Sequence, residues 1–495
     1  MMKHWILLLG FAFFSLSSTY AQSLEDAVRF SRLSNLATAR TIASGGALGP
    51  MGVDFGAFGN NPAGLARLRY SEALISFGAT YLNTKAGYAE SNFTQNQDKV
   101  TPTINGFALS FANPGRRSKW LSRNFSIGLS RNASFNRELN LVDNTSGSIT
   151  DRFLDLANGL QPVDLDPFEA GLAFDVLAID TLPGTNDVYF SDLEGVPSVT
   201  KDIVVKNSGS INELQIAFGG NYNNKLLIGA GIGFSFIDYK SERTHFEEDV
   251  DASIDFFQDL TFQDKLESVG AGVNVKLGLI YMINNEIFIS VAGQSPTWYL
   301  LTDTYETNLE YAFDEGFDNE VYFDEIAPNE FEYNFTSPWK LSGGVGTIIN
   351  NNGFVSLEVE YLDYTQAKYD LTTNSSNTVN TADTDAVNAD IENILQTAIN
   401  IKLGGEYRFG DMRLRGGFQT TKSPFLDFDE GRTSISAGFG YRLNKFFVDL
   451  GAVYSIQDEL YFPYTIPFDF NAYSQPVIEN KLTNINLVLT LGTKF

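Results

Sequence analysis

A strict alternation of apolar and polar residues constrains this chain more than any other feature. In residues 484–491 every second side chain is Ile or Leu, and the residues between them are Asn, Val or Thr. A period of two places successive side chains on opposite faces of a β-strand. The same pattern recurs at residues 228–236 and 399–408, so we expect an all-β protein.

Fourteen stretches are predicted to be strands. They span residues 71–83, 102–113, 123–135, 209–221, 225–239, 268–283, 286–300, 334–349, 353–367, 396–409, 411–421, 432–443, 445–457 and 482–495. Long connections are predicted at residues 84–101, 136–208, 240–267, 301–333, 368–395, 422–431 and 458–481. They alternate with six short ones, as in bacterial outer-membrane barrels with tight periplasmic turns and long outer loops. A soluble β-sandwich has no reason to keep this order, so we predict a transmembrane antiparallel barrel over residues 71–495.

The start of the chain predicts export. Lys3 and His4 precede an apolar run, and Ala21 ends a region of small residues, so residues 1–21 are expected to form a signal peptide. The chain contains no Cys, which excludes disulfides and a lipid attached at cysteine. We therefore place the protein in the outer membrane of a Gram-negative cell.

The charge of the chain is strongly negative, with a formal net charge of −26. Eleven acidic residues and no Lys or Arg occur in residues 301–333, and nine acidic residues occur in residues 241–267. Such loops repel nucleic acid and face lipopolysaccharide and outer-membrane lipid. A calcium site at residues 314–318 is the alternative, but the acidic residues there lack an ordered ligand spacing, so no metal is expected.

Residues 22–70 do not follow the strand pattern. A helix is expected near residues 24–36, followed by small residues and by Asn61, Pro62, Ala63 and Gly64 directly before the first strand. This segment is too long for a linker and too apolar for a disordered tail. We expect it to fold inside the barrel as a plug, in which Asn61-Pro62-Ala63-Gly64 forms a structural turn.

Several of these segments together resemble the FadL/TodX family of outer-membrane transporters for hydrophobic compounds. The matching segments are Thr38-Ala39-Arg40, Ser44-Gly45-Gly46-Ala47, Asn61-Pro62-Ala63-Gly64, Pro338-Trp339-Lys340, Gly404-Gly405-Glu406-Tyr407, Arg415-Gly416-Gly417 and Ser423-Pro424. Gly52-Val53-Asp54-Phe55 replaces the paired acidic residues that are common in the family. The resemblance implies a fourteen-stranded barrel with an N-terminal hatch and passive uptake of long-chain fatty acids or other hydrophobic small molecules.

The family also implies a kinked third strand that opens the barrel wall to lateral diffusion. Phe125, Ile127 and Leu129 are predicted to face lipid, and Arg131 is next in phase. A lipid-facing Arg near the bilayer midplane costs about 2–4 kcal/mol. We expect a bulge at Ser130, Arg131 and Asn132 that turns Arg131 inward. Alternatively, Arg131 already lies at the level of the lipid headgroups.

The longest predicted loop contains two amphipathic stretches. Asp166 and Pro167 are expected to begin one helix. A groove for an acyl chain is predicted between the two helices, lined by Phe153, Leu156, Leu160, Phe168, Leu172 and Val176. In the alternative, these side chains pack only on one another or on aromatic residues at the barrel rim.

The remaining polar residues suggest structure rather than catalysis. By parity, Glu358, Glu360, Lys402, Glu406, Arg408, Arg413 and Arg415 face the lumen, where we expect an ion-pair network. His245, the one histidine after residue 21, lies in an acidic loop near Glu247 and Glu248. We expect no catalytic residue and no cofactor.

Three functional classes follow. The first is a monomeric channel for a hydrophobic small molecule such as a fatty acid. The second is a FadL-like barrel subunit of a larger outer-membrane assembly or protein-secretion complex. The third is a structural or porin-like barrel.

Overall fold

The computed structural model describes residues 20–34, 36–52, 54–115, 119–195, 198–314, 320–372, 381–466 and 475–495. Nearly all of the predicted signal peptide therefore lies outside the described residues. In the described part of the chain, no helix is long and apolar enough to cross a bilayer.

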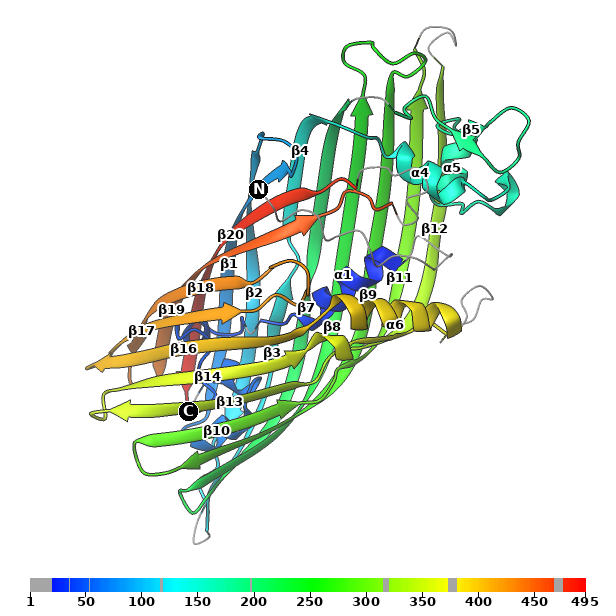
Figure 1. Cartoon of the computed structure of the whole chain (residues 1–495). Coiled ribbons are helices and arrows are strands. Elements are labelled where there is room, and N and C mark those ends of the chain that lie inside the picture. Colours follow the sequence, from blue (N-terminus) through cyan, green and yellow to red (C-terminus); the bar gives the residue numbers. More distant parts are fainter. Residues whose placement is uncertain are drawn as a thin grey trace.

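The strands form one closed antiparallel sheet, in which the last strand pairs with the first (Figure 1). They are β1 (Glu72–Tyr88), β2 (Gln95–Phe111), β3 (Trp120–Ser134), β4 (Arg137–Thr145), β7 (Val199–Tyr222), β8 (Leu226–Glu248), β9 (Asp259–Met282), β10 (Ile287–Gln294), β11 (Trp298–Ala312), β12 (Val321–Thr336), β13 (Lys340–Ile349), β14 (Gly353–Asp363), β15 (Lys368–Asp370), β16 (Thr397–Phe409), β17 (Met412–Thr421), β18 (Arg432–Arg442), β19 (Phe446–Tyr461) and β20 (Ile478–Lys494). Four wall positions hold two segments end to end: β3 with β4, β10 with β11, β12 with β13, and β14 with β15. The described residues therefore form a fourteen-stranded barrel, as predicted.

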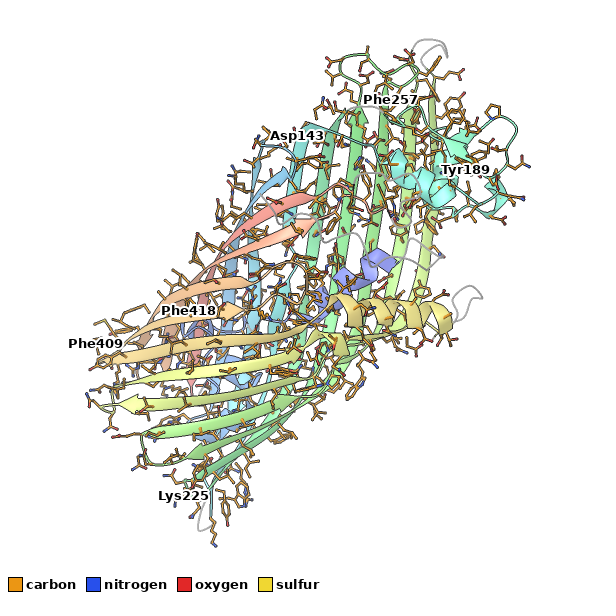
Figure 2. The ribbon with its side chains drawn as sticks, viewed as in Figure 1. Asp143, Tyr189, Lys225, Phe257, Phe409 and Phe418 are labelled. Atoms are coloured by element: carbon orange, nitrogen blue, oxygen red, sulfur yellow. The ribbon has the colours of Figure 1, made fainter. Side chains whose placement is uncertain are left out.

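The two ends of the barrel differ. Lys225 and Phe409 lie at the end with short turns, and Tyr189 and Phe257 lie at the opposite end with long connections (Figure 2). We call these the turn end and the loop end. In bacterial outer-membrane barrels the short turns face the periplasm, so the loop end is the outer one.

The outer face of the barrel carries an apolar belt. On β8, Ile228, Ile232 and Phe236 are between 39% and 48% exposed, although they are large apolar residues. Farther toward the loop end, the outward positions of β8 become Asp238 and Glu242. The belt therefore ends near residue 237. We call the parts of β7, β8, β9, β11 and β12 beyond the belt the wall extension.

Three of the predicted long loops are wrong in part, because they contribute strands to the wall extension. They are residues 136–208, 240–267 and 301–333. Most of residues 240–267 and 301–333 is strand, and β4 and the start of β7 occupy the two ends of residues 136–208. The predicted loop 84–101 is also shorter than expected, because β1 continues to Tyr88 and β2 begins at Gln95. The prediction failed because the outward positions of the wall-extension strands change from apolar to charged, while the inward positions stay mostly buried. On β11, Leu309 and Tyr311 are fully buried on either side of Glu310. The alternation therefore continues where its lipid-facing half has ended.

The N-terminal segment, residues 24–68, lies inside the barrel. It contains most of α1 (Tyr20–Ser31), and α2 (Ala39–Ala43), α3 (Phe55–Phe58) and the 3-10 helix η1 (Pro62–Arg67). Helix α1 begins earlier and ends earlier than the predicted helix over residues 24–36. It ends before Ser34 because the backbone there turns to hydrogen-bond the barrel wall.

Glycines in the wall hold η1 on one side of the lumen. A Cβ at Gly229 would lie 2.2 Å from the backbone nitrogen of Ala63, and one at Gly278 would lie 2.0 Å from Oδ1 of Asn61. No larger residue fits at either position without moving η1. The glycine-rich residues 229–233 of β8 thus begin at the seat of this turn.

A second set of wall glycines holds α2 on the opposite strands. A Cβ at Gly404 would lie 2.0 Å from the carbonyl oxygen of Ser44, and one at Gly451 would lie 2.5 Å from that of Ala39. The N-terminal segment is therefore clamped between two closely fitting wall surfaces.

The loop end carries the remaining elements. Between β4 and β7 lie α4 (Thr150–Ala157), η2 (Pro162–Asp164), α5 (Ala170–Asp175), β5 (Asp180–Thr181) and β6 (Tyr189–Phe190), which together form the cap. The cap packs its buried apolar side chains against Leu309 and Tyr311 of the wall extension. Between β14 and β16 lie η3 (Tyr364–Gln366), β15 and α6 (Thr381–Ile394), and α6 contacts α1.

Candidate ligand cavity and wall seam

A cavity of about 2490 Å³ lies inside the barrel and is lined by the N-terminal segment, the wall, α6 and the cap. Its aromatic lining includes Phe135, Phe168, Tyr239, Tyr305, Phe331, Tyr333, Tyr364, Tyr369, Phe425 and Phe428. Arg432 also lines it, and this guanidinium is in no ion pair with a described carboxylate. Its Nη2 donates to the hydroxyl of Ser34 at 2.8 Å. The cavity therefore combines extensive apolar surface with a cationic group that has no described carboxylate partner.

The barrel wall beside this cavity is incompletely paired. β2 and β3 pair only from Phe111–Phe125 to Gly106–Ser130, although both strands continue. β2 carries a register shift against β1 at Asn105, and β3 carries one against β7 at Asn132. We call the region beyond the last pair, between residues 99–105 of β2 and residues 131–134 of β3, the wall seam.

The N-terminal segment bonds to both sides of the seam. The backbone N–H groups of Ser34 and Leu36 donate to the carbonyl oxygens of Asn132 (2.7 Å) and Arg131 (3.2 Å). Nδ2 of Asn105 donates to the carbonyl oxygen of Leu36 at 2.9 Å. The carbonyl groups of β3 that do not pair with β2 thus accept hydrogen bonds from the N-terminal segment inside the barrel.

Comparison with known proteins supports the same architecture. A FadL homologue from Pseudomonas aeruginosa matches with a TM-score of 0.53 at 11% identity, over 94% of this chain and 99% of that one. A deltaS2 mutant of the TodX monoaromatic hydrocarbon channel matches with a TM-score of 0.50 at 13% identity, over 93% of this chain and 99% of that one. The chain has the FadL/TodX fold.

Two sequence comparisons add to this assignment. A family model described as BamG matches residues 165–408, slightly under half of the chain. That range begins in the cap and ends in β16. No curated protein matches the sequence.

In this FadL/TodX fold, Asn61-Pro62-Ala63-Gly64 forms a packed turn of the N-terminal segment. Oδ1 of Asn61 accepts the N–H of Ala63 at 3.1 Å, and its Nδ2 donates to the carbonyl oxygen of Gly49 at 3.2 Å. Pro62 begins η1, and Gly64 lies against Gly52, where a Cβ would be 2.7 Å from Cα of Gly52. All four residues bury their surface in the segment rather than in the cavity lining.

Ser130, Arg131 and Asn132 lie at the seam, but the predicted rotation of Arg131 is wrong. Arg131 pairs with Asn212 and stays in phase with Phe125 and Leu129. The extra residue is Asn132, so the change of phase begins one residue later and Ala133 reaches the cavity lining. Ser130 is fully buried, and its Oγ accepts Nε2 of Gln215 at 2.8 Å.

The predicted groove is not open. Phe153, Leu172 and Val176 are at most 1% exposed because they form the core between the cap and the wall extension. Leu160 is 42% exposed and does not line the cavity. Of the six predicted residues, only Leu156 and Phe168 reach the cavity.

The predicted helix start at Asp166 and Pro167 is also wrong, because α5 begins at Ala170. Glu169 precedes α5 and binds Arg152 of α4 through Nε and Nη2. Burial lowers the pKa of Arg152, but the charge of Glu169 and its hydrogen bonds together outweigh burial, so the pKa is raised. This ion pair joins the two helices of the cap above the cavity.

The lumen charges form two networks. Lys402 binds Glu360 at 3.0 Å. Arg415 binds Glu406 at 2.7 Å and Asp449 at 2.7 Å. Arg40 of the N-terminal segment also binds Glu406, at 2.9 Å, so the second network attaches that segment to the wall.

Arg408 and Arg413, which we predicted in the same network, are not part of it. Both donate instead to the carbonyl oxygen of Gly410 at the turn end. Strand parity gave their direction correctly, but it could not show how close they lie to the turn.

His245 lies on β8 rather than in a loop. Its Nε2 is 2.6 Å from Oε1 of Glu247, which also accepts the N–H of Ile149. Oε2 of Glu247 accepts the Ser148 hydroxyl. The serine thus bonds to the carboxylate and not to the histidine, which differs from a nucleophile–base arrangement. These contacts fix the start of α4 to the wall extension.

Proposed function

We propose that this protein is an outer-membrane channel through which hydrophobic small molecules move passively. A molecule enters the cavity from the loop end, is held among the aromatic side chains, and leaves sideways through the wall seam. Residues 22–70 serve as the plug. The observation that carries the proposal is that the cavity lies beside a released strand edge to which Ser34 and Leu36 hydrogen-bond.

Long-chain fatty acids are the substrate class that fits this cavity best. An acyl chain gains about 0.8 kcal/mol per buried CH₂ group among apolar side chains. Arg432 faces the same cavity without a described carboxylate partner, and a guanidinium forms strong bidentate bonds with a carboxylate.

The proposal is tested by a substitution that narrows the wall seam. Ala133 lies at the seam and lines the cavity, so Ala133→Trp fills the exit. Ala230 faces lipid on the fully paired strand β8, so Ala230→Trp is the matched control. We expect uptake of radiolabelled oleate by cells to fall at least about tenfold for A133W and to stay near the parent rate for A230W.

Surface amount and heat-modifiable gel mobility show whether each variant is folded in the membrane. A133W that is folded and takes up oleate at the parent rate would refute exit through the seam.

A second candidate function is a barrel subunit of a larger outer-membrane assembly. The wall extension favours it, because strands that rise beyond the apolar belt offer surface that a lipid-facing channel does not need. Native mass spectrometry after gentle extraction separates the two. A monomer with bound fatty acids supports the channel, and a stoichiometric protein complex with an empty cavity supports the subunit.

A further inference from the structure

The wall extension ends in a strand with one unpaired edge. β12 pairs with β11 along its length, but on its other side only Asn334, Phe335 and Thr336 pair, with β15. No described strand pairs with the other edge of residues 321–331. In sheets such edges are sites for the addition of a further strand.

The register shows which backbone groups face this edge. The N–H of Phe313 donates to the carbonyl oxygen of Glu320, so the hydrogen-bonded pairs of the hairpin are 311 with 322, 309 with 324 and 307 with 326. Val321, Phe323 and Glu325 therefore direct their N–H and C=O groups away from β11. The N–H of Glu325 is donated to the Asp324 carboxylate at 2.8 Å, a local bond that an incoming strand would replace.

Edge strands of soluble proteins are usually protected by charge, proline or a bulge. β12 has this protection in its lower part, where Pro328 lies at a register shift between residues 326 and 329. The part above Pro328 is different, because Val321 is 58% exposed and Phe323 is 56% exposed. Two large apolar side chains beside free backbone groups are features of an interface rather than of a protected edge.

The charge around this edge selects the partner. Glu310, Glu320, Asp324 and Glu325 surround it, and none of them forms an ion pair with a described residue. Residues 301–333 contain no Lys or Arg. A second copy of this chain is disfavoured, since pairing two such edges would bring like charges together.

We infer that the free edge of β12, over residues 321–326, binds an extended, Lys- or Arg-bearing segment of another protein outside the cell by β-strand addition. Backbone hydrogen bonds to Val321, Phe323 and Glu325 provide the docking. An apolar side chain of the segment lies against Phe323 on the outer face of β12, and a basic side chain on the opposite face meets Asp324.

Synthetic peptides test this inference on the full-length protein in detergent. The probe is a fluorescein-labelled seven-residue peptide in which Val alternates with Lys or Arg, and the control peptide carries Glu at the basic positions. We expect the basic peptide to bind at least tenfold more tightly than the acidic one, with an affinity that falls as salt rises. Absence of binding by the basic peptide at millimolar concentration would overturn the inference.

Substitutions at Phe323 separate strand addition from charge attraction. Phe323→Pro removes an N–H that β11 does not use, so the barrel stays folded while the edge loses a donor. Phe323→Ala keeps the N–H and removes the ring. We expect at least a tenfold loss for F323P and less than a threefold loss for F323A. Equal binding to F323P and the parent protein would contradict strand addition.

A final arm requires no variant protein. Peptides N-methylated on alternate residues lose binding only when the blocked N–H groups face β12. If methylation leaves binding unchanged on both sets of residues, the peptide is held by charge alone and the inference fails.

Discussion

β7 and β8 pair through 23 consecutive residue pairs, from Tyr222–Leu226 to Thr200–Glu248, whereas β2 and β3 pair through only six. All four strands carry apolar side chains on their outer faces, such as Phe107, Phe218 and Ile232. At the seam, however, the inward polar groups bond to the N-terminal segment. Asn105 donates to Leu36, and the backbone of Asn132 accepts from Ser34. Whether two neighbouring strands pair along their full length thus depends on the hydrogen bonds that their inward groups make. The alternation of side chains alone does not decide it.

The largest expected effect comes from disturbing the seat of η1 on the continuous wall. Gly229→Val would place Cβ about 2 Å from the backbone of Pro62 and Ala63, so η1 must move. We expect a loss of several kcal/mol in stability and a large rise in ion conductance in planar bilayers, because the plug no longer fits. Gly343→Val is the control, since its nearest neighbour is 3.8 Å away. Equal conductance of G229V and G343V would show that the seat does not hold the plug.

The next largest effect tests whether the N-terminal segment blocks the wall seam. Asn105→Ala removes the bond to Leu36, and a hydrogen bond contributes about 0.5–1.5 kcal/mol net. We expect oleate uptake to rise about two- to tenfold, because the N-terminal segment leaves the seam more often. Ser110→Ala, in the paired part of the same strand, should leave uptake unchanged. A fall in uptake for N105A would contradict the blocking role of residues 34–36.

A smaller effect depends on pH and on the cap above the paired wall. Burial raises the pKa of Asp151 to about 6, and the N–H of Ser148 only partly offsets it. The folded state therefore binds a proton that the unfolded state, with a pKa of about 4, has lost. Cap stability should fall by about 1–2 kcal/mol as pH rises from 4 to 7. Asp151→Asn should reduce that dependence, and the rest comes from Asp166 of the same cap, whose pKa burial also raises to about 6.

Urea unfolding measured by a fluorophore at Val163→Cys checks this prediction. Val163 is 84% exposed and the chain has no other cysteine. The opposite slope, with the cap most stable at pH 7, would show that another group controls it.

The smallest effect concerns an ion pair on the outside of the wall extension. Lys265 binds Glu306 at 2.7 Å, but both side chains are about one-third exposed. Such pairs contribute about 0–1 kcal/mol. Lys265→Met should therefore change only slightly the urea concentration at the midpoint of unfolding, measured with the same fluorophore at position 163. A large loss would mean that surface charge, rather than continuous strand pairing, supports the extension.

The sequence predicted the barrel well because lipid imposes a simple rule on every strand. Ile228, Ile232 and Phe236 face outward as expected. The wall extension was missed since its outward residues, such as Glu310, resemble those of a solvated loop. The unbroken inward alternation of Leu309 and Tyr311 was the signal that could have revealed it.

The candidate site was less predictable. A bulge was expected within Ser130–Asn132 and lies at Asn132, but it leaves Arg131 in phase with Leu129. The backbone carbonyl groups of Arg131 and Asn132 accept N–H groups from residues 36 and 34, nearly a hundred positions earlier, and no local pattern shows this. The prediction of the groove was wrong because helical spacing identifies the apolar face of a helix but not the surface on which that face packs. Phe153 and Leu172 pack on the wall extension, which had been taken for a loop. Asn105 carried no signal, because a single polar residue in a strand is common.

Exit through the seam is tested most directly by a cryo-electron-microscopy map of the protein incubated with a brominated fatty acid. The account predicts bromine density that runs from the cavity beside Phe135 into the gap between Ile104 and Ala133. Density that instead passes the N-terminal segment toward the turn end, with no ligand between β2 and β3, would contradict it.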